Sequence, residues 1–339
     1  MNNFQYRKEM SAKTAVNSAA SRNETAFIAG GTNIIDLWKY NITNPEILID
    51  INDIEELKHI QELENGGVRL GALVKNADTA YHPLIEEQYP LLSKAILAGA
   101  SAQIRNMATD GGNLLQRTRC YYFYDPDVPC NKRSPGSGCP ALNGFNRMHA
   151  ILGANDNCIA VFPSDMCVAL AALDAVVNVR SVNGERSIPF EDFHRLPGDT
   201  PHLDNTLEKG EIITSIDLPP NKLNQNYSYL KLRDRHSYAF ALVSVAAAFE
   251  INGKQITNAA IALGGVAHKP WRVKEAEKFL IGKQATEQNF EQAAVIILDG
   301  AVGRGDNDFK IPLARRAVIR ACFMALNPNT QRPGAQPAL

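Results

Sequence analysis

Four of the six cysteines, Cys120, Cys130, Cys139 and Cys158, lie in one long stretch that is rich in proline, glycine and asparagine. Nine, eight and eighteen residues separate them in turn, so no pair has a Cys-x-x-Cys spacing. Four thiolates can hold a tetrahedral zinc ion or a cubane iron–sulfur cluster, and their softness suits both. Two disulfides are a third option in an oxidising compartment. Because a loop this long is usually functional or disordered, four thiols predict that something holds it.

Two glycine pairs form a second candidate site. The first, Gly30-Gly31, follows a short apolar strand and precedes a helix that starts at Ile34. This arrangement suits an anion, because glycine allows close approach and free amides at a helix start point toward the charge. Alone it is more typical of a tight turn, and without GxGxxG it does not support a Rossmann site. The second pair, Gly111-Gly112, is also flanked by Thr and Asn, so we expect both pairs to converge on one diphosphate.

The composition limits the classes of partner. The chain has 339 residues, 45% hydrophobic and 21% charged, with a formal net charge of −1, which gives no reason to expect nucleic acid or an anionic membrane. No apolar run approaches the roughly 20 residues of a membrane span. The N-terminal residues lack a signal peptide, so the default expectation is a cytoplasmic chain unless a partner carries it elsewhere. In a reducing compartment, clustered thiols favour metal ligands over disulfides.

The hydrophobic periodicity predicts helices and strands in both halves of the chain. Helices are expected from a cap at Ser11 to about Ala20, over 34–39, 90–97 and 165–175, and from Trp271, Thr286 and Pro312. Strands are expected near 26–29, 47–51, 68–74, 175–179, 211–218, 229–232, 241–249 and 256–264. The stretch 219–226 is predicted to be a linker, and Cys167 and Cys322 are predicted to be core thiols. The tail 327–339 is expected to be disordered or wrapped on a partner.

Several separated motifs occur in a fixed order along nearly the whole chain. They are Ala29-Gly30-Gly31-Thr32-Asn33, Ile104-Arg105-Asn106, Thr109 with Gly111-Gly112-Asn113, Pro163-Ser164-Asp165, Gly210-Glu211-Ile212-Ile213, Lys231-Leu232-Arg233, Ala239-Phe240-Ala241 and Gly264-Gly265-Val266-Ala267. In these motifs the chain resembles the FAD-binding subunits of molybdenum hydroxylases. The resemblance implies an α+β fold with a two-part FAD-binding domain of the PCMH or vanillyl-alcohol-oxidase type at 1–220. A CO-dehydrogenase-flavoprotein-type C-terminal α+β domain would follow at 225–326.

The resemblance also implies where FAD would lie. The stretch that would hold the diphosphate and adenosine comprises Phe27, Ile28, Ala29, Gly30, Gly31, Thr32, Asn33, Ile34 and Ile35. The residues that would contact the cofactor from the other side are Thr109, Gly111, Gly112, Asn113 and Ile213. Asp165 would hydrogen-bond the ribityl chain, and Lys231 would lie near the flavin, where its charge could stabilise the reduced anionic form. Without the motif, Lys231 would be interpreted as a solvated strand charge. No residue is expected to act as a catalytic acid, base or nucleophile.

Residues 114–162 depart from the family members that have only a short connection between Asn113 and Pro163. They resemble the iron–sulfur insert of bacterial periplasmic aldehyde oxidoreductases more than that of 4-hydroxybenzoyl-CoA reductases. A redox cluster near FAD can relay or store electrons, whereas zinc would only brace the loop, so we predict a [4Fe-4S] cluster on Cys120, Cys130, Cys139 and Cys158. Two further sets of residues are expected either to serve the cluster or to dock a partner. The first comprises the basic residues Arg117, Arg119, Lys132 and Arg133, for which a solvated surface is equally plausible. The second is the aromatic run 121–124.

The predicted function is that of the FAD and [4Fe-4S] subunit of a heterotrimeric molybdenum-dependent aldehyde oxidoreductase. Its expected partners are a large molybdenum-cofactor subunit, a small [2Fe-2S] subunit that delivers electrons, and an external acceptor. The alternatives are the equivalent subunit of a 4-hydroxybenzoyl-CoA reductase-like or xanthine dehydrogenase-like enzyme, and a zinc-braced assembly module without redox function. A partner with a twin-arginine signal would place the complex in the periplasm; otherwise it would be cytoplasmic.

Overall fold

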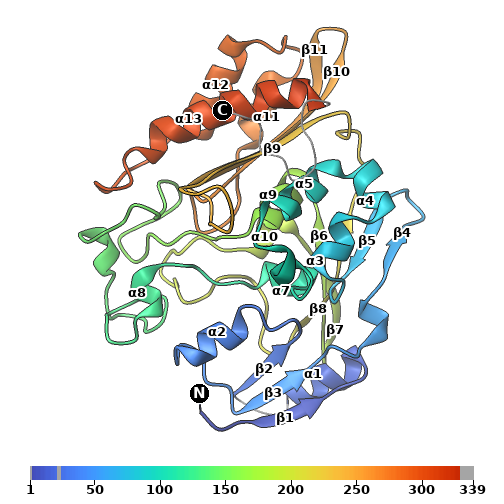
Figure 1. The fold of residues 1–339 in the computed structure, drawn as a ribbon, viewed down its shortest axis with the longest axis vertical. Helices are drawn as coiled ribbons and strands as arrows, with labels where there is room; N and C mark the ends of the chain where they lie inside the picture. The colour runs from blue at the N-terminus through green and yellow to red at the C-terminus, as the bar shows by residue number, and fades with distance from the viewer. Residues whose placement is uncertain (1, 21–23, 329–339) are drawn as a thin grey trace.

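The computed structural model describes residues 2–20 and 24–328, and Figure 1 shows their arrangement. Three β-sheets organise the chain. A parallel sheet at the N-terminal end has the order β1-β3-β2. Its elements are β1 (Gln5–Lys8), α1 (Ala12–Ala20), β2 (Thr25–Ile28), α2 (Ile34–Lys39) and β3 (Ile47–Asp50). No helix within these described residues is long and apolar enough to cross a membrane.

The second sheet is antiparallel and five-stranded, with the order β4-β5-β8-β6-β7. Its strands are β4 (Ile60–Glu62), β5 (Val68–Gly71), β6 (Val176–Ser181), β7 (Gly184–Pro189) and β8 (Ile212–Leu218). The helical elements between and beside them are η1 (Glu55–Leu57), α3 (Asn76–Ala80), α4 (Pro83–Gln88), α5 (Pro90–Ala98), α6 (Ala102–Arg105), α7 (Asp110–Leu114), α9 (Asp165–Ala172) and α10 (Phe190–Phe193). Residues 115–164 carry only two short helices, α8 (Tyr121–Tyr124) and η2 (Pro140–Leu142).

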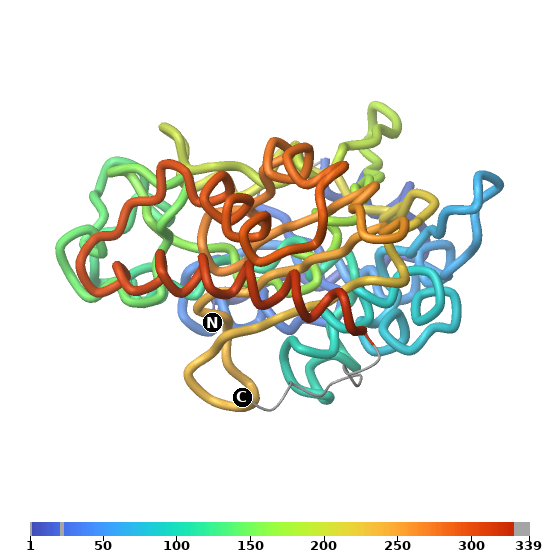
Figure 2. The backbone as a smooth tube through the Cα atoms, turned by 90° about the horizontal axis from the view of Figure 1, so that it is seen from above, coloured from blue at the N-terminus to red at the C-terminus, as the bar shows by residue number. Residues whose placement is uncertain are grey.

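The third sheet, here called the C-terminal sheet, has the antiparallel order β12-β11-β10-β9. It comprises β9 (Asn226–Leu232), β10 (Val243–Asn252), β11 (Gln255–Gly264) and β12 (Trp271–Arg272). Helices α11 (Lys274–Leu280), α12 (Glu287–Ile297) and α13 (Lys310–Leu326) complete this part of the chain, and α13 runs along the sheet (Figure 2). Alternate residues of β10 enter two separate cores: Ala246 and Ala248 pack with α5 and α9, and Val245 and Phe249 pack with α13. Burial on both faces explains why this strand is almost entirely apolar.

Most predicted elements are confirmed within a few residues, including α1 with Ser11 accepting a hydrogen bond from the Thr14 amide at 3.2 Å. The predicted helix start at Trp271 is wrong, because Trp271 and Arg272 form edge strand β12 and the helix begins at Lys274. The core positions of Cys167 and Cys322 are confirmed, since both are fully buried. Of the predicted tail, residues 329–339 lie outside the described residues.

The predicted linker 219–226 is a packed connection. The Asn221 side chain donates to the Gln88 carbonyl at 2.6 Å, Tyr89 donates to the Pro219 carbonyl at 2.7 Å, and Leu223 is buried. The C-terminal sheet is therefore fixed against α4 and α5 through this connection as well as through its apolar face.

Candidate cofactor sites

Two cavities meet at Thr32, Asn33 and Gly112. The smaller has a volume of about 280 Å³ and the larger about 810 Å³, which together suit a dinucleotide-sized ligand. Predicted residues that line the smaller cavity are Phe27, Ala29, Gly30, Gly31, Thr32, Asn33, Ile34, Thr109, Gly111, Gly112 and Ile213. Predicted residues that line the larger are Thr32, Asn33, Gly112, Asn113, Asp165 and Lys231. Ile28 and Ile35 line neither cavity.

The first glycine pair lies directly against the second glycine segment. A Cβ atom at Gly30 would stand 1.9 Å from the Met107 carbonyl oxygen, and Gly31 has a positive φ of 72°. The backbone N–H groups of Gly30, Gly31 and Thr32 donate no hydrogen bond to any other described residue. The Nδ2 of Asn33 also has no partner in the described part of the chain, but the atom itself is enclosed by the protein. This segment therefore offers unused donors where the two cavities join, as an anionic diphosphate requires.

The amides of the second glycine pair are already hydrogen-bonded within the chain, so this pair allows close backbone packing and offers no free donors. The Gly111 amide donates to the Ala72 carbonyl at 2.9 Å, and the Gly112 amide donates to Thr109 Oγ1 at 3.2 Å. The Asn113 amide donates to the Thr109 carbonyl at 2.8 Å. A Cβ atom at Gly111 would lie 2.9 Å from the Cβ of Ala72, so glycine is needed for this approach. The structure brings the two pairs together, and their shared contact with a diphosphate stays a prediction.

The side chain of Asn113 belongs to a buried polar network. Its Nδ2 donates to Asn76 Oδ1 at 2.7 Å, and its Oδ1 accepts from Ser164 Oγ at 2.6 Å. Asn76 in turn donates to Asp110 Oδ1 at 2.7 Å, and Thr79 donates to Asp110 Oδ2 at 2.5 Å. Burial raises the pKa of Asp110 to about 7, although the two donors act in the opposite direction. The network ties the second glycine segment to the Pro163-Ser164-Asp165 motif.

Asp165 and Lys231 form an ion pair at the wall of the larger cavity. The Lys231 Nζ lies 2.8 Å from Asp165 Oδ2, and the side chains are 2% and 8% exposed. The interpretation of Lys231 as a solvated strand charge is therefore wrong. Tyr229, which the sequence analysis did not single out, donates to Asp165 Oδ1 at 2.7 Å. Its position two residues before Lys231 on one strand was the signal, because such residues share a strand face.

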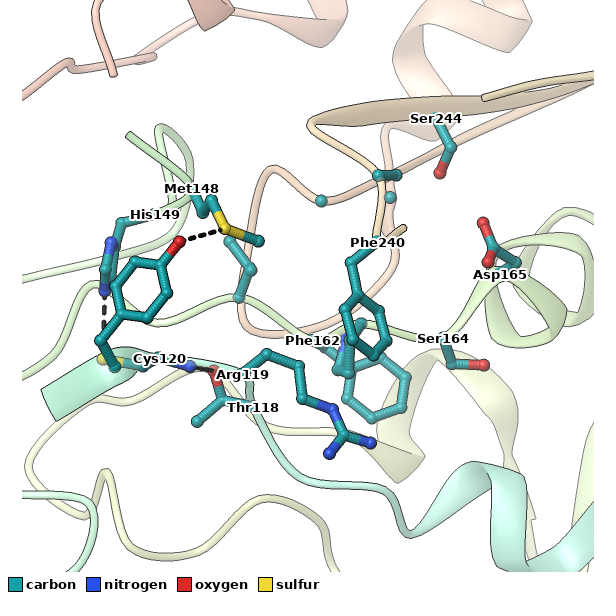
Figure 3. Close-up of a pocket in the computed structure, with 16 residues that line it drawn as sticks. Thr118, Arg119, Cys120, Met148, His149, Phe162, Ser164, Asp165, Phe240 and Ser244 are labelled. Carbon is teal, nitrogen blue, oxygen red and sulfur yellow. Dashed lines mark hydrogen bonds between the residues drawn. The ribbon is translucent and has the colours of Figure 1, made fainter. Parts of the chain in front are cut away.

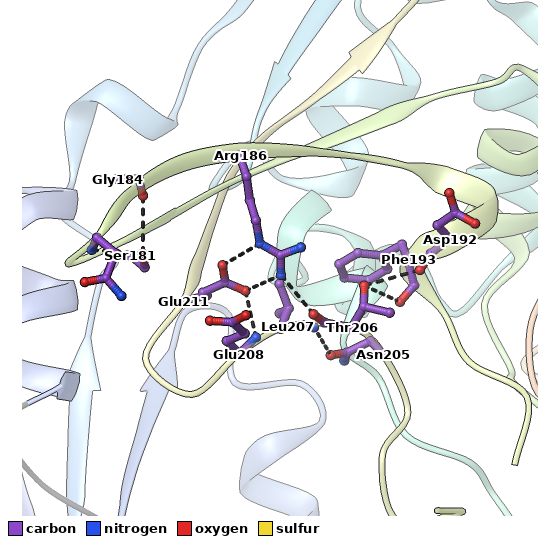
Figure 4. A network of polar contacts seen from close by, with 11 residues as sticks. Ser181, Gly184, Arg186, Asp192, Phe193, Asn205, Thr206, Leu207, Glu208 and Glu211 are labelled. Atoms are coloured by element: carbon purple, nitrogen blue, oxygen red, sulfur yellow. Dashed lines mark hydrogen bonds and ion pairs between the residues drawn. The ribbon is translucent and has the colours of Figure 1, made fainter. Parts of the chain in front are cut away.

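An arginine that the sequence analysis also missed supports the wall of the smaller cavity (Figure 4). Arg186 donates to both carboxylate oxygens of Glu211, from Nε at 2.7 Å and from Nη2 at 2.6 Å. The Glu208 amide donates to the same carboxylate at 2.7 Å. Burial raises the pKa of Glu211, but the Arg186 bonds outweigh it and lower the pKa overall. The bidentate pair fixes the chain immediately before Ile212 and Ile213, which line the cavity.

The four predicted cysteine ligands line one water-sized cavity of about 10 Å³. The neighbouring thiols of Cys139 and Cys158 act on each other, so that the pKa of Cys139 falls to about 6 and that of Cys158 rises. Burial raises the pKa of Cys120 to about 12. All four are free thiols. Their type and common cavity fit a thiolate-bound centre, but nowhere in residues 2–20 and 24–328 are three or more His, Cys, Asp or Glu side chains arranged to hold a metal ion.

A fourth cavity, of about 20 Å³, shares Cys120 and His149 with the cysteine cavity and Asp165 and Phe240 with the larger cavity. Figure 3 shows the residues that line it. Cys120 and His149 line it on one side, and Asp165 and Phe240 line it on the other. His149 Nε2 lies 3.1 Å from Cys120 Sγ, and its Nδ1 has no partner among the described residues. Burial lowers the pKa of His149 to about 4, so the ring is neutral at pH 7. Cys120 is thus the cysteine that faces both neighbouring spaces.

The basic and aromatic residues of the cysteine segment are mostly internal supports. Lys132 is 4% exposed and donates to Asp204 at 2.5 Å and to the Pro201 carbonyl at 2.7 Å, so the solvated-surface alternative is wrong for it. Arg117 donates to the same carboxylate at 2.6 Å. Within the aromatic run, Tyr122 and Phe123 line the cysteine cavity, whereas Tyr121 is exposed. Tyr124 packs against the hydrophobic cluster that contains Cys130, and Tyr121 lines the neighbouring small cavity with Cys120, so shielding of the thiols fits Tyr122, Phe123 and Tyr124 best.

Comparison with known proteins agrees with this architecture. Residues 2–221 match the family described as the FAD binding domain in molybdopterin dehydrogenase. Residues 227–324 match the CO dehydrogenase flavoprotein C-terminal domain. The chain belongs to the FAD-binding subunits of the molybdenum hydroxylases. As such it is a flavoprotein subunit of an oxidoreductase, and the fold class implied by the motifs is confirmed.

Individual relatives of this flavoprotein subunit cover most of its length. It is 47% identical to the aldehyde oxidoreductase FAD-binding subunit PaoB of Escherichia coli, over 94% of this chain and 96% of that protein. It is 28% identical to the glyceraldehyde dehydrogenase medium chain of Sulfolobus acidocaldarius, over 84% and 83%. Among solved structures, carbon monoxide dehydrogenase from Hydrogenophaga pseudoflava superposes with a TM-score of 0.75 at 25% identity, covering 96% of this chain and 99% of that chain.

Proposed function

We propose that this chain is the electron-transfer subunit, carrying FAD and a [4Fe-4S] cluster, of a heterotrimeric molybdenum-dependent aldehyde oxidoreductase. The observation that carries the proposal is the adjacency of the two joined cavities to a cavity ringed by four thiols, with Cys120 between them. The 47% identity to an aldehyde oxidoreductase subunit supports the aldehyde as the substrate of the whole enzyme. Electrons would arrive from a small [2Fe-2S] subunit and leave to an external acceptor.

FAD would occupy the joined cavities, where it supplies the exchange between one-electron and two-electron chemistry. The unused amides of Gly30, Gly31 and Thr32 would hold the diphosphate, with Asn33 lining the junction beside them. Phe27 and Ile213 would enclose the adenosine in the smaller cavity. The flavin end would then lie in the larger cavity, with Asp165 at the ribityl chain. The size of the cavities and the unpaired donors at their junction support this placement.

The cluster would be held by Cys120, Cys130, Cys139 and Cys158 and would supply one-electron transfer. Ligand binding requires deprotonated thiols, so all four free cysteines would have to lose their protons. Once Cys120 is a thiolate it has no proton to donate, and the neutral His149 ring would donate its Nε2–H to that sulfur. A structure with the cluster bound should show both changes.

The same proposal covers the domain boundary of this chain, its partner subunits and the compartment of the complex. We infer a boundary between an FAD-binding domain at 1–220, with the cysteine segment as its insert, and a C-terminal domain at 225–326. A large molybdenum-cofactor subunit would oxidise the aldehyde, and no residue here would act on it. A partner bearing a twin-arginine signal would carry the assembled complex to the periplasm.

The test is anaerobic purification of the complete complex, followed by quantitation of FAD, iron and sulfide and by EPR of the reduced protein. We expect a cluster signal in addition to those of the small subunit, lost in Cys139→Ser while FAD remains. Cys322→Ser, at a fully buried cysteine outside the cavities, is the matched control and should keep the signal. FAD with zinc and no additional cluster would contradict the cluster assignment.

The direction of electron flow needs a separate assay. We expect the complex to reduce an artificial acceptor with aldehydes, and the isolated chain to oxidise none. Turnover of an aroyl-CoA with a low-potential donor, without aldehyde oxidation, would instead indicate the reductive alternative. A colourless protein with zinc, no iron and no flavin would support the assembly module and would overturn the proposal as a whole.

A further inference from the structure

Three buried side chains from two distant parts of the chain meet at the wall of the larger cavity. Asp165 is the first residue of α9, whereas Tyr229 and Lys231 lie on β9 of the C-terminal sheet. Asp165 Oδ1 accepts from Tyr229 Oη at 2.7 Å, and Oδ2 accepts from Lys231 Nζ at 2.8 Å. Both carboxylate oxygens are therefore held by donors on one face of one strand.

The surroundings leave little freedom to this cluster. Lys231 Nζ also donates to the Ala98 carbonyl at 3.1 Å, and Arg233 Nη1 donates to the same carbonyl at 3.3 Å. A Cβ atom at Gly99 would lie 3.0 Å from Asp165 Oδ2, so the backbone packs closely on the carboxylate. With 2% and 8% exposure the two charges are poorly screened by solvent, and each strongly affects the field of the other.

We propose that Lys231 and Asp165 act on the bound flavin as one electrically neutral unit, and that Tyr229 and Lys231 are positioning residues that fix the Asp165 carboxylate. This inference rests on the FAD placement proposed above. It replaces the expectation that Lys231 presents a positive charge to the reduced flavin, because an opposite charge lies 2.8 Å from its nitrogen. The contribution of this pair to the flavin potential is then the sum of its two charges and not that of the lysine alone.

A double-mutant cycle on the flavin potential tests the proposal. The purified complex is titrated spectroelectrochemically as wild type, Lys231→Met, Asp165→Asn and the double variant. Reduction adds electrons to the flavin, so the unpaired carboxylate of Lys231→Met should shift the potential downward and the unpaired ammonium of Asp165→Asn should shift it upward. The double variant should return close to the wild-type value. A double variant as low as Lys231→Met would show that the lysine acts alone and would overturn the neutral unit.

Two additional variants control for a failure to fold and for effects of breaking an ion pair elsewhere. Lys231→Arg keeps the charge and should stay near the wild-type potential even if Lys231→Met does not fold. Lys274→Met is the matched control, because Lys274 also pairs with an aspartate of the other half of the chain, Asp174 at 2.6 Å, but lines neither flavin cavity. Its flavin potential should not change.

Tyr229→Phe tests the positioning role separately. Loss of its hydrogen bond should lower FAD affinity several-fold, with a smaller change of potential than either charge variant gives. Unchanged FAD affinity and unchanged flavin potential would show that Tyr229 does not position the Asp165 carboxylate. If the wild-type chain holds no FAD, the cofactor placement itself fails; if FAD is bound but the two charge effects simply do not cancel, only the neutral unit fails.

Discussion

The two joined cavities and the cysteine cavity differ in how far they are prepared for the ligands proposed for them. The joined cavities are about 280 and 810 Å³ in volume and meet where the backbone amides of Gly30, Gly31 and Thr32 have no partner in the described chain. The cysteine cavity is only water-sized, and within the described part of the chain its four sulfurs are not arranged to hold a metal ion. One site has donors in place, whereas the other has ligands gathered but not arranged.

This difference follows from the chemistry of the two ligand sets. Neutral amides can stand together around an empty cavity without electrostatic repulsion, so a diphosphate site can exist before its ligand arrives. Four thiolates repel one another unless a cation lies between them, and as thiols they keep protons and share hydrogen bonds. A cysteine site is therefore completed by its metal, and the surrounding contacts, such as Lys132 with Asp204, must hold the segment until then.

The largest effect on the flavin side is expected from Gly30→Val. A Cβ atom there would overlap the Met107 carbonyl oxygen at 1.9 Å and force the two glycine segments apart. We expect FAD affinity to fall by more than about 100-fold, a loss of roughly 3 kcal/mol. FAD per chain is measured by absorbance, and iron should be retained. Gly66→Ala is the control, because Gly66 lines neither cavity and a Cβ atom there would meet nothing within 4 Å. Equal FAD content in both variants would contradict the assignment.

On the cysteine side, Asp204→Asn should have the largest effect. Burial raises the pKa of Asp204, but Arg117 and Lys132 outweigh it and lower the pKa overall. Removing the carboxylate charge leaves Lys132 buried without its counter-ion, which should cost about 3 kcal/mol of unfolding free energy. Iron content should fall more than FAD content. Asp53→Asn, which breaks the exposed pair with Lys8, should change stability by less than about 1 kcal/mol. The opposite order of iron and FAD loss would show that Lys132 does not support the cysteine cavity.

A smaller effect is expected from Asn113→Ala. This change removes the link between Asn76 and Ser164 and loosens the second glycine segment. We expect FAD affinity to fall about 10-fold, or roughly 1.4 kcal/mol. Asn178→Ala removes a comparable pair of hydrogen bonds on β6, with Ser215 and Ser187, and should leave FAD affinity unchanged. A similar loss in both variants would assign the effect to general stability.

The smallest effect concerns pH and Lys310, which is fully buried and donates to the carbonyls of His149 at 2.8 Å and Gly265 at 2.5 Å. Burial lowers the pKa of Lys310 to about 7, below its value in the unfolded chain. Above pH 7 the unfolded state then binds more protons than the folded state, so this residue makes stability rise with pH. Between pH 7 and 8 the gain should be about 1 kcal/mol, and Lys310→Met should lack it. Parallel stability–pH curves for the two proteins would disprove the shift.

The parts of this molecule that could be predicted from the sequence are those with a regular apolar pattern or a recognisable motif. Regular apolar spacing predicted α1, α2 and α5, and glycine pairs flanked by Thr and Asn predicted the junction of the cavities. Strands β1, β4 and β7 were missed because they are short, mostly polar edge strands. Such edges gain little from burial, so their sequences carry little hydrophobic pattern.

The supporting contacts of the sites were beyond reach of the sequence alone. Tyr229 reaches Asp165 across 64 positions, and Lys132 reaches Asp204 across 72. No local pattern records such pairs, because they depend on which strand and loop the fold places side by side. The same holds for Arg186 and Glu211. The glutamate belongs to a motif that the sequence shows, but its partner is an arginine on the edge strand β7, which no motif marks.

The most direct test of the account is a crystal structure of the anaerobic complex with anomalous data at the iron and zinc edges. The account predicts iron scattering enclosed by Cys120, Cys130, Cys139 and Cys158, and continuous FAD density through both larger cavities. A single zinc peak, or disulfide density among these cysteines, beside bound FAD would contradict the cluster, and cavities without FAD density would contradict the cofactor placement.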